Sequence, residues 1–475
     1  MEPLTTRARR SRFRHTPGVL AALAIVALVA ACGGSTATTA PASAPAASPA
    51  TSAAAPSAAA SSPAASAPAA SASGAASAAK CGTYAGPPVE LTYAMWGDTT
   101  ELANQQKIVD AFTALNPNIK VKVSVADWES YWPKLQTDLA GGNAPDIFLM
   151  DGPLFPDYQT RDQLLDLDPL IAKDGFDKGS LVDLAVKDFA GADGHQYGLP
   201  RDLNTIALFY NKKMFDAAGI PYPDDTWDWA KLVEVAKQLT KTTEGAPQWG
   251  FYTETSDMEN DWSSLVWQAG GDILSADKKS VLIDTDQAAA GIQFLQDLIY
   301  KDKVMQQPVP GGGDDLFDSG QAAMEANGSW LVPTHEDAGI DFGVAPLPKG
   351  PAGSATSVNP SGVVVYKGTK SADAAWEFVK CYTGPELQAM IASLKASMPA
   401  NKEILTGQYA TSFDGGKVFA DALAYAHLKP SFKGYDEFTT ALQDELDTNV
   451  FNNNQKAAKA ALDDVTPKLQ QLLGQ

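Results

Sequence analysis

Between residues 89 and 150, segments with the hydrophobic spacing of strands alternate with segments that have the spacing of helices. These residues begin the globular part of the chain, called the body below. The segment Val-Glu-Leu-Thr-Tyr-Ala-Met-Trp at 89–96 predicts a strand, and apolar residues at helical spacing over 108–115 predict a helix that ends before Pro117. Alternation over 121–125 predicts a half-buried strand. A second amphipathic helix then leads to a short apolar strand at 145–150. This β-α-β-α-β order predicts parallel strands joined by helical crossovers, as in an α/β fold.

The rest of the body is predicted to be richer in helix. We expect short strands near residues 198, 208 and 283 and at 341–347 and 362–366, with helices at 232–239, 288–300, 316–326, 372–382 and, with breaks, 386–473. No internal repeat and no long linker divides this part of the chain. The absence of a repeat or a dividing linker fits two lobes between which the chain passes several times.

The N-terminus has the pattern of an export signal. Five arginines precede an apolar run of thirteen residues from Val19 to Ala31. Such a run is too short to span about 30 Å of hydrocarbon comfortably, so residues 1–31 predict a secretory signal peptide. The block Val-Ala-Ala that precedes Cys32 resembles the bacterial lipobox, whose cysteine is lipidated and becomes the mature N-terminus. An ordinary signal peptide with a chance cysteine is the alternative.

A low-complexity segment separates Cys32 from the body. Residues 33–79 contain only alanine, serine, proline, threonine and glycine, which offer no periodic face to bury. We therefore assign 32–80 as a lipid-anchored linker with a mean reach on the order of 40 Å. The predicted location is that of an exported bacterial lipoprotein at the outer face of the cytoplasmic membrane.

The charge balance narrows the possible partners. The chain has 36 basic and 56 acidic residues, a formal net charge of −20. Nucleic acid is excluded as a partner because binding it requires a basic face. An acidic body is repelled by anionic lipid, so we expect the membrane to be contacted through the lipid anchor only. Three cysteines and four histidines, all far apart in sequence, exclude zinc ribbons and disulfide-dense scaffolds, and we expect no cofactor and no metal.

Catalytic motifs are missing from the sequence. It has no Gly-x-Ser-x-Gly, His-Glu-x-x-His or Walker motif, and His195, His335 and His427 are isolated along the chain. Carboxylates are plentiful, so composition leaves a glycoside hydrolase open as the enzymatic alternative. Since nothing marks one carboxylate pair, we expect no enzyme.

Several blocks carry a family resemblance. The run Tyr-Gly-Leu-Pro-Arg-Asp at 197–202 continues through Thr-Ile-Ala-Leu-Phe-Tyr-Asn at 205–211 to Asp-Ala-Ala-Gly-Ile at 216–220. It is similar to the signature of extracellular sugar-binding proteins of ABC transporters, the maltose-binding-like group. Further blocks follow in that family's order, at 135–147, 317–330, 343–348 and 374–379. The resemblance covers roughly residues 88–475.

The resemblance implies an architecture and a function. The fold class would be α/β, a two-lobed periplasmic-binding-protein fold with a hinge and an inter-lobe ligand cleft. Lobe 1 would hold residues 85–203 and 346–383, and lobe 2 would hold 204–345 and 384–475, with hinge crossings near Asn204, 344–347 and 382–386. The protein would be a monomeric, high-affinity extracytoplasmic receptor that binds a mono- or oligosaccharide and delivers it to the permease subunits of an ABC importer.

A sugar site makes recognisable demands on side chains. A pyranose ring needs a flat aromatic side chain against its apolar face and carboxylates or amides for its hydroxyl rim. Trp330 is the residue that the family uses as a stacking platform. Some of the other candidate side chains come directly after predicted strands, and two lie at the first hinge crossing. The remaining two, Trp262 and Tyr435, lie later in the chain. The predicted ligand residues are Trp96, Asp98, Glu101, Asp151, Asp202, Asn204, Trp262, Trp330 and Tyr435.

Two questions stay open at the level of sequence. The same fold could bind a non-sugar solute, such as a glycerol phosphoester or a polyamine. Cys81 and Cys381 are the two thiols that remain after lipidation, and export places them in an oxidising compartment. The family packs the helix that ends at Cys381 in the lobe that Cys81 begins, which favours a disulfide over two separate thiols.

Overall fold

The chain divides into two units, residues 1–71 and residues 72–475. The structure is a computed structural model that describes residues 81–242, 247–256, 258, 262–308 and 316–474. The predicted signal peptide 1–31, the predicted anchor Cys32 and the predicted linker 32–80 lie outside the described residues. Among the described helices, none is both long enough and apolar enough to cross a membrane.

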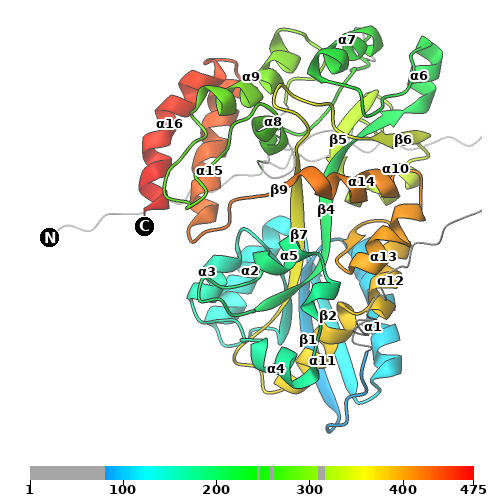
Figure 1. Cartoon of the computed structure of the whole chain (residues 1–475), viewed down its shortest axis with the longest axis vertical. Coiled ribbons are helices and arrows are strands. Elements are labelled where there is room, and N and C mark those ends of the chain that lie inside the picture. The colour runs from blue at the N-terminus through cyan, green and yellow to red at the C-terminus, as the bar shows by residue number, and fades with distance from the viewer. Residues whose placement is uncertain (1–80, 243–246, 257, 259–261, 309–315, 475) are drawn as a thin grey trace, which may run out of the picture. The chain divides into compact units, whose positions relative to one another are not determined.

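A mixed β-sheet is the framework of the described body (Figure 1). Its main path runs in the order β2-β1-β3-β7-β4-β5, and three shorter strands pair with β4 or β7. The strands are β1 (Val89–Trp96), β2 (Ile119–Ala126), β3 (Ile147–Asp151), β4 (Gly198–Asn211), β5 (Met324–Gly328), β6 (Phe342–Ala345), β7 (Thr356–Val365), β8 (Met398–Pro399) and β9 (Ala426–Leu428). Strands β1, β2 and β3 pair in parallel, which confirms the parallel order predicted from periodicity.

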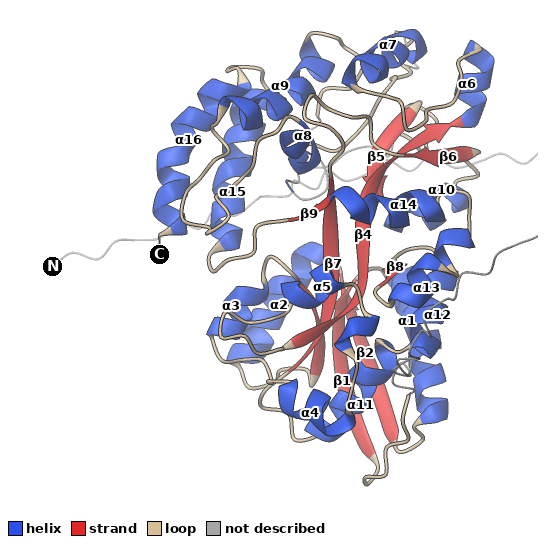
Figure 2. Ribbon diagram, in the orientation of Figure 1, coloured by secondary structure: helices blue, strands red, loops and turns tan. Residues whose placement is uncertain are grey.

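Helices surround this sheet (Figure 2). In the first half of the body they are α1 (Thr99–Leu115), α2 (Trp128–Ala140), α3 (Phe155–Thr160), α4 (Asp168–Asp174), α5 (Asp183–Asp188), α6 (Lys212–Ala218), α7 (Trp229–Leu239) and α8 (Ser263–Gln268). In the second half they are α9 (Asp286–Tyr300), α10 (Val332–Asp337), α11 (Ala372–Tyr382), α12 (Pro385–Leu394), α13 (Lys402–Thr406), α14 (Gly416–Ala422), α15 (Tyr435–Leu446) and α16 (Ala458–Leu473). The predicted α/β class is confirmed.

Two long strands, β4 and β7, connect the two groups of helices. They pair antiparallel along most of their length, and β4 also pairs with β5, β6 and β8 (Figure 1). Fourteen residues of β4 form one continuous strand, where the sequence predicts two short strands near 198 and 208. Because nearly every β4 side chain is buried, the strand shows no period-two alternation that would reveal its length.

Separate hydrophobic cores lie around the two ends of these strands. One face of β1–β3 packs against α1, α11 and α12, and the opposite face packs against α2 and α3. The other end of β4 packs against α7, α8, α9, α15 and α16. A further core includes β4, Phe317 and Phe419 and extends to α13. Strands β4 and β7 contribute residues to several of these cores and therefore join them mechanically.

Two local predictions are wrong. The helix expected at 316–326 is replaced by a turn and by β5, which is buried at all five positions and pairs with β4. The alanines favour a helix locally, but pairing with a central strand outweighs that weak preference. The strand expected near Ile283 is absent from the described residues, where Val281 makes an isolated pairing with Leu274.

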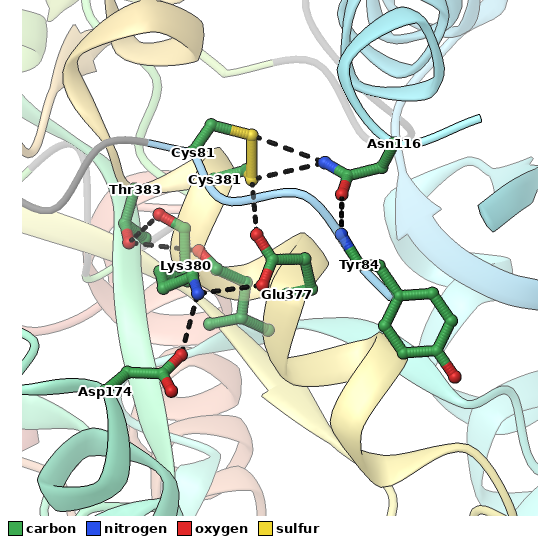
Figure 3. The surroundings of a disulfide bond; sticks show 9 residues. Cys81, Tyr84, Asn116, Asp174, Glu377, Lys380, Cys381 and Thr383 are labelled. Carbon is green, nitrogen blue, oxygen red and sulfur yellow. Dashed lines mark hydrogen bonds and ion pairs between the residues drawn. A yellow bond between two sulfur atoms is a disulfide. The ribbon is translucent and has the colours of Figure 1, made fainter. Parts of the chain in front are cut away.

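A disulfide joins Cys81 to Cys381, across 300 positions of sequence (Figure 3). This is the pairing that the sequence favours. The buried side chain of Asn116 lies beside it, with Nδ2 3.5 Å from the sulfur of Cys81 and 3.7 Å from that of Cys381. Asn116 Oδ1 also accepts the Tyr84 N–H at 2.7 Å. The disulfide therefore fixes the start of the described chain to α11, and the hydrogen bond between Tyr84 and Asn116 fixes it to the end of α1.

Candidate functional site

A cavity of about 610 Å³ lies where α2 and α3 face α15 and the segment around Met258. The first wall is contributed by Trp128, Glu129, Trp132, Gln136, Leu154, Asp157, Tyr158 and Arg161. The second wall is contributed by Glu254, Ser256, Met258, Tyr435, Asp436, Glu437, Thr439, Thr440, Gln443 and Asp444. The volume falls in the range of small-molecule pockets.

Local sequence explains why α2 presents an aromatic wall. Asp127 caps the helix by accepting the Ser130 N–H at 3.0 Å. Tyr131, Leu135 and Leu139 recur every four residues and are buried. Trp128, Trp132 and Gln136 recur with the same spacing, displaced by one position along the helix, and face the cavity instead.

The tryptophans of this wall belong to a packed aromatic cluster. Trp128 and Trp132 lie with their ring centroids 5.3 Å apart, edge to face. Trp96, at the end of β1, lies behind them with centroid separations of 5.1 Å and 5.6 Å. Tyr158 of α3 continues the cluster at 6.1 Å from Trp132. Because the rings hold one another, the wall is a preformed apolar surface.

The polar lining is rich in carboxylates. Six of the lining residues are acidic, and Arg161 is the single basic residue among them, with its guanidinium 3.7 Å from Asp157. Partial desolvation raises the pKa of Asp436, and the charges of Glu437 and Asp157 raise it further. Burial likewise raises the pKa of Tyr158 to about 12, so its phenol is neutral and can donate a hydrogen bond at neutral pH.

Hydrogen bonds to buried residues support the second wall on the side away from the cavity. Gln443 of α15 accepts the indole N–H of Trp262 at 3.2 Å and donates to the Thr255 carbonyl at 2.6 Å. Trp262 is completely buried in the core around α8 and α9. These bonds hold Thr255 and Trp262 against α15, so the side chain of Gln443 in the cavity wall is oriented by a core tryptophan.

Hydrogen bonds also join the first wall to residues 431–434, which come directly before α15 of the second wall. Gly434 N–H donates to Asp157 Oδ2 at 3.2 Å, and Ser431 Oγ donates to the Gly152 carbonyl at 2.8 Å. Nearby, Lys429 Nζ lies 3.9 Å from Asp151 Oδ1, and both side chains are buried. The edge of the cavity is thus closed by polar contacts.

The nine predicted ligand residues fall in different places. Tyr435 lines the cavity, while Trp96 and Trp262 lie behind its two walls. Asp98 accepts the N–H groups of Thr100 and Glu101 and caps α1, and Glu101 accepts the Asp98 N–H in return. Desolvation raises the pKa of Glu101, and the charge of Arg201 opposes that shift.

The remaining four predicted residues lie on or next to the central strands: Asp151 ends β3 beside Lys429, Asp202 and Asn204 lie on β4, and Trp330 follows β5. Asp202 is buried on β4, 3.3 Å from the guanidinium of Arg201. Asn204 Oδ1 accepts the Ser329 hydroxyl at 2.6 Å. The ring of Trp330 lies over Gly328, where an added Cβ would stand 2.0 Å from the indole, so glycine is required for this approach. None of these residues lines the cavity of about 610 Å³.

Sequence reasoning missed most of the cavity wall. The tryptophans and Gln136 of α2 were included in an amphipathic helix without any assigned role, and Asp157, Tyr158 and Arg161 received none. The available signal was the aromatic density of Trp128, Tyr131 and Trp132 within five residues. The opposing wall comes from two later parts of the chain, Glu254 to Met258 and Tyr435 to Asp444, roughly 100 and 300 positions after the first wall, and no local pattern reports that approach.

Comparison with known proteins identifies the family. Residues 96–389, more than half of the chain, match the model of the bacterial extracellular solute-binding proteins. The chain belongs to this family. Membership confirms the resemblance that the sequence motifs carry. As a solute-binding protein, it is related to receptors and not to an enzyme family.

Individual relatives agree with this membership. A Brucella abortus protein named as a binding protein is 26% identical to this solute-binding protein over 341 residues, 70% of this chain and 81% of the relative. The maltooligosaccharide ABC transporter solute-binding lipoprotein of Streptococcus pneumoniae is 24% identical over 372 residues, 75% of this chain and 83% of its own.

A solved structure supports the fold independently. An ABC substrate-binding protein of Listeria monocytogenes, in complex with cycloalternan, matches with a TM-score of 0.76 and 27% identity. The match covers 82% of this chain and 99% of that protein. The two-lobed α/β fold predicted for this solute-binding protein is confirmed.

Proposed function

We propose that this solute-binding protein is a high-affinity extracytoplasmic receptor that binds a sugar or oligosaccharide and delivers it to an ABC import permease. The observation that carries the proposal is the cavity that joins aromatic faces on α2 to carboxylates, amides and hydroxyls on α15. The relatives named as maltooligosaccharide-binding and cycloalternan-bound support the ligand class.

The cavity matches the surface of a saccharide. The apolar C–H face of a pyranose packs on flat indoles such as Trp128 and Trp132, and its hydroxyl rim donates to carboxylates such as Asp436. The hydroxyls of Thr439 and Thr440 add groups that both donate and accept. A neutral, hydroxyl-rich ligand uses both kinds of surface at once.

Ligand binding is proposed to close two lobes around the sugar. Lobe 1 comprises 85–203 and 346–383, and lobe 2 comprises 204–345 and 384–475, with β4 and β7 as the long strands between them. Because only a few residues of each connecting segment lie at the boundary between the lobes, the lobes can move as rigid bodies about it. Trp330 lies next to the Ser329–Asn204 hydrogen bond and outside the cavity of about 610 Å³, so its proposed stacking role requires a ligand that extends beyond that cavity.

Export and anchoring complete the proposal. Residues 1–31 act as a signal peptide, Cys32 carries the lipid, and 32–80 tether a monomeric body that reaches the permease. The Streptococcus pneumoniae relative is named as a lipoprotein, which supports this reading. Catalysis is not part of the proposed role, since receptors of this family deliver their ligand unchanged.

An amine-bearing solute such as a polyamine is the second candidate. Six carboxylates line the cavity against one arginine, which is already beside Asp157. That excess of negative charge favours a cation by Coulomb attraction. The same excess disfavours a glycerol phosphoester, because an anionic phosphate prefers a site of Arg, Lys or backbone N–H groups.

A thermal-shift screen separates these candidates. The purified protein is heated with mono- and oligosaccharides, spermidine and a glycerophosphodiester, since a ligand at 100-fold its Kd stabilises a protein by about 2.7 kcal/mol. A sugar that raises the melting temperature and is recovered uncleaved by chromatography supports the proposal. A shift with spermidine and none with any sugar would transfer the assignment to the amine, and cleavage of the sugar would restore the hydrolase alternative.

A further inference from the structure

Three potential metal ligands meet at the surface, where residues 166–168 run beside 195–196. Leu167 N–H donates to the Gln196 carbonyl at 2.8 Å, and both of these residues are buried. Their sequence neighbours Asp166, Asp168 and His195 remain partly or fully exposed. The backbone bond therefore fixes two carboxylates and one imidazole in a common exposed position.

The distances among these groups, which include a hydrogen bond between His195 and Asp168, are compatible with a metal site. His195 Nδ1 lies 3.3 Å from Asp166 Oδ2 and 3.1 Å from Asp168 Oδ2. The three ligand atoms all lie within 4.8 Å of one another. Ligands held about 2.0–2.1 Å from a tetrahedral zinc ion are themselves about 3.3–3.4 Å apart. An ion can thus be accommodated with small side-chain movements.

We propose that Asp166, Asp168 and His195 form a surface binding site for a divalent transition-metal ion, best matched by Zn²⁺ with water as the fourth ligand. A neutral imidazole selects transition metals over Ca²⁺ and Mg²⁺, which prefer oxygen ligands. Two carboxylates balance the charge of the ion. Among the described residues, the other three-ligand group is Cys81, Glu377 and Cys381, whose sulfurs are bonded to each other and offer no thiolate.

A lysine competes with the metal at this site. Lys178 Nζ lies 3.7 Å from Asp168 Oδ1 and donates to Gln196 Oε1 at 3.2 Å. In the metal-free protein this ammonium neutralises part of the carboxylate charge. Metal binding therefore displaces a positive charge. Removing Lys178 should strengthen metal binding if the cluster is a metal site, whereas it only removes a favourable ion pair if the cluster binds no metal.

The site is connected to the cavity wall through the turn that carries His195. Asp193 of that turn accepts the Tyr197 hydroxyl at 2.7 Å and the Gln159 amide at 3.3 Å. Gln159 belongs to α3, which supplies Asp157 and Tyr158 to the cavity. A metal ion that joins the turn to the start of α4 would stiffen the support of α3.

Zinc titration of the purified exported protein by calorimetry tests the site, with Co²⁺ absorption as a second readout of tetrahedral coordination. His195→Gln and Asp166→Asn should each weaken Zn²⁺ binding by at least about 100-fold, since losing even an outer-shell partner costs 10- to 100-fold. His427→Gln is the matched control, because His427 stacks on Trp267 away from the cluster and should leave binding unchanged.

Lys178→Met should strengthen Zn²⁺ binding if the cluster is a metal site. Circular dichroism confirms that each variant is folded, and the use of two ligand variants keeps the test decisive if one of them unfolds. Absence of Zn²⁺ binding in the unmodified protein, or binding that survives both ligand substitutions, overturns the proposal.

Discussion

Trp128→Ala is the substitution that most directly tests the cavity as the ligand site. Trp128 lines the cavity from the first turn of α2 and is 39% exposed. A tryptophan side chain presents up to about 250 Å², so about 100 Å² is available to a ligand. At about 25 cal/mol per Å², covering all of it contributes about 2.5 kcal/mol, and covering one face contributes about half of that.

The expected loss of affinity is therefore about 8- to 70-fold. Calorimetry with the sugar that gives the largest thermal shift measures it directly. Tyr222→Ala is the matched control, because Tyr222 has the same exposed fraction of 39% and lies outside the cavity. Trp128→Phe, which keeps a flat apolar face, should lose less than Trp128→Ala.

One result would refute this reasoning. If Trp128→Ala binds the sugar as tightly as the unmodified protein, with an unchanged melting temperature, the ligand does not cover the α2 wall. If Tyr222→Ala weakens binding equally, the loss reflects a general change in the body and not a contact.

Four further predictions concern stacking, titration, cross-linking and anchoring. Trp330→Ala should weaken sugar binding by about 2–4 kcal/mol in calorimetry if the stacking role holds, and unchanged affinity would remove it from the site. Since the folded-state pKa of Asp436 is raised above its ordinary value of about 3.8, the native state holds its proton more tightly and stability falls as pH rises through that window. Asp436→Asn should abolish this component in melting curves from about pH 3 to pH 7, and identical pH profiles would contradict it. Cys381→Ser removes the cross-link that closes a 300-residue loop and should lower the free energy of unfolding by up to about 6 kcal/mol, measured by denaturant titration, while two free thiols in the unreduced protein by mass spectrometry would show that no bond exists. Cys32→Ser should release the protein from the membrane fraction, and retention there would disprove the anchor.

Sequence patterns predicted the fold best where contacts are local. The first two strands and the helix between them follow from periodicity because each element buries one face and exposes the other. The third strand is buried at all five positions and was predicted from its short apolar run alone. The pattern failed at β4 and β5, which are buried on both faces and carry no alternation. Their boundaries depend on pairing partners far away in sequence.

The site was harder to predict for the same physical reason. Tyr435, predicted because an aromatic side chain near a loop suits a sugar, lines the cavity, whereas the sequence assigns Trp128 and Trp132 only to an amphipathic helix. A tryptophan on α2 acquires its role only when α15 stands opposite. His195 shows the same limit, since its carboxylate neighbours lie 27 and 29 positions earlier.

The polar contacts at the cavity edge would connect ligand binding to the proposed lobe closure. The Gly434–Asp157 bond at 3.2 Å and the Ser431–Gly152 bond at 2.8 Å contribute about 0.5–1.5 kcal/mol each, with more for the bond to a carboxylate. In the proposed opening of the lobes, breaking both bonds would therefore cost about 2–4 kcal/mol. A sugar that touches both Trp128 and Tyr435 makes its full set of contacts only while the edge is closed. Affinity and closure must then rise together, because the free energy of the ligand contacts adds to that of the bonds that already hold the two walls in place.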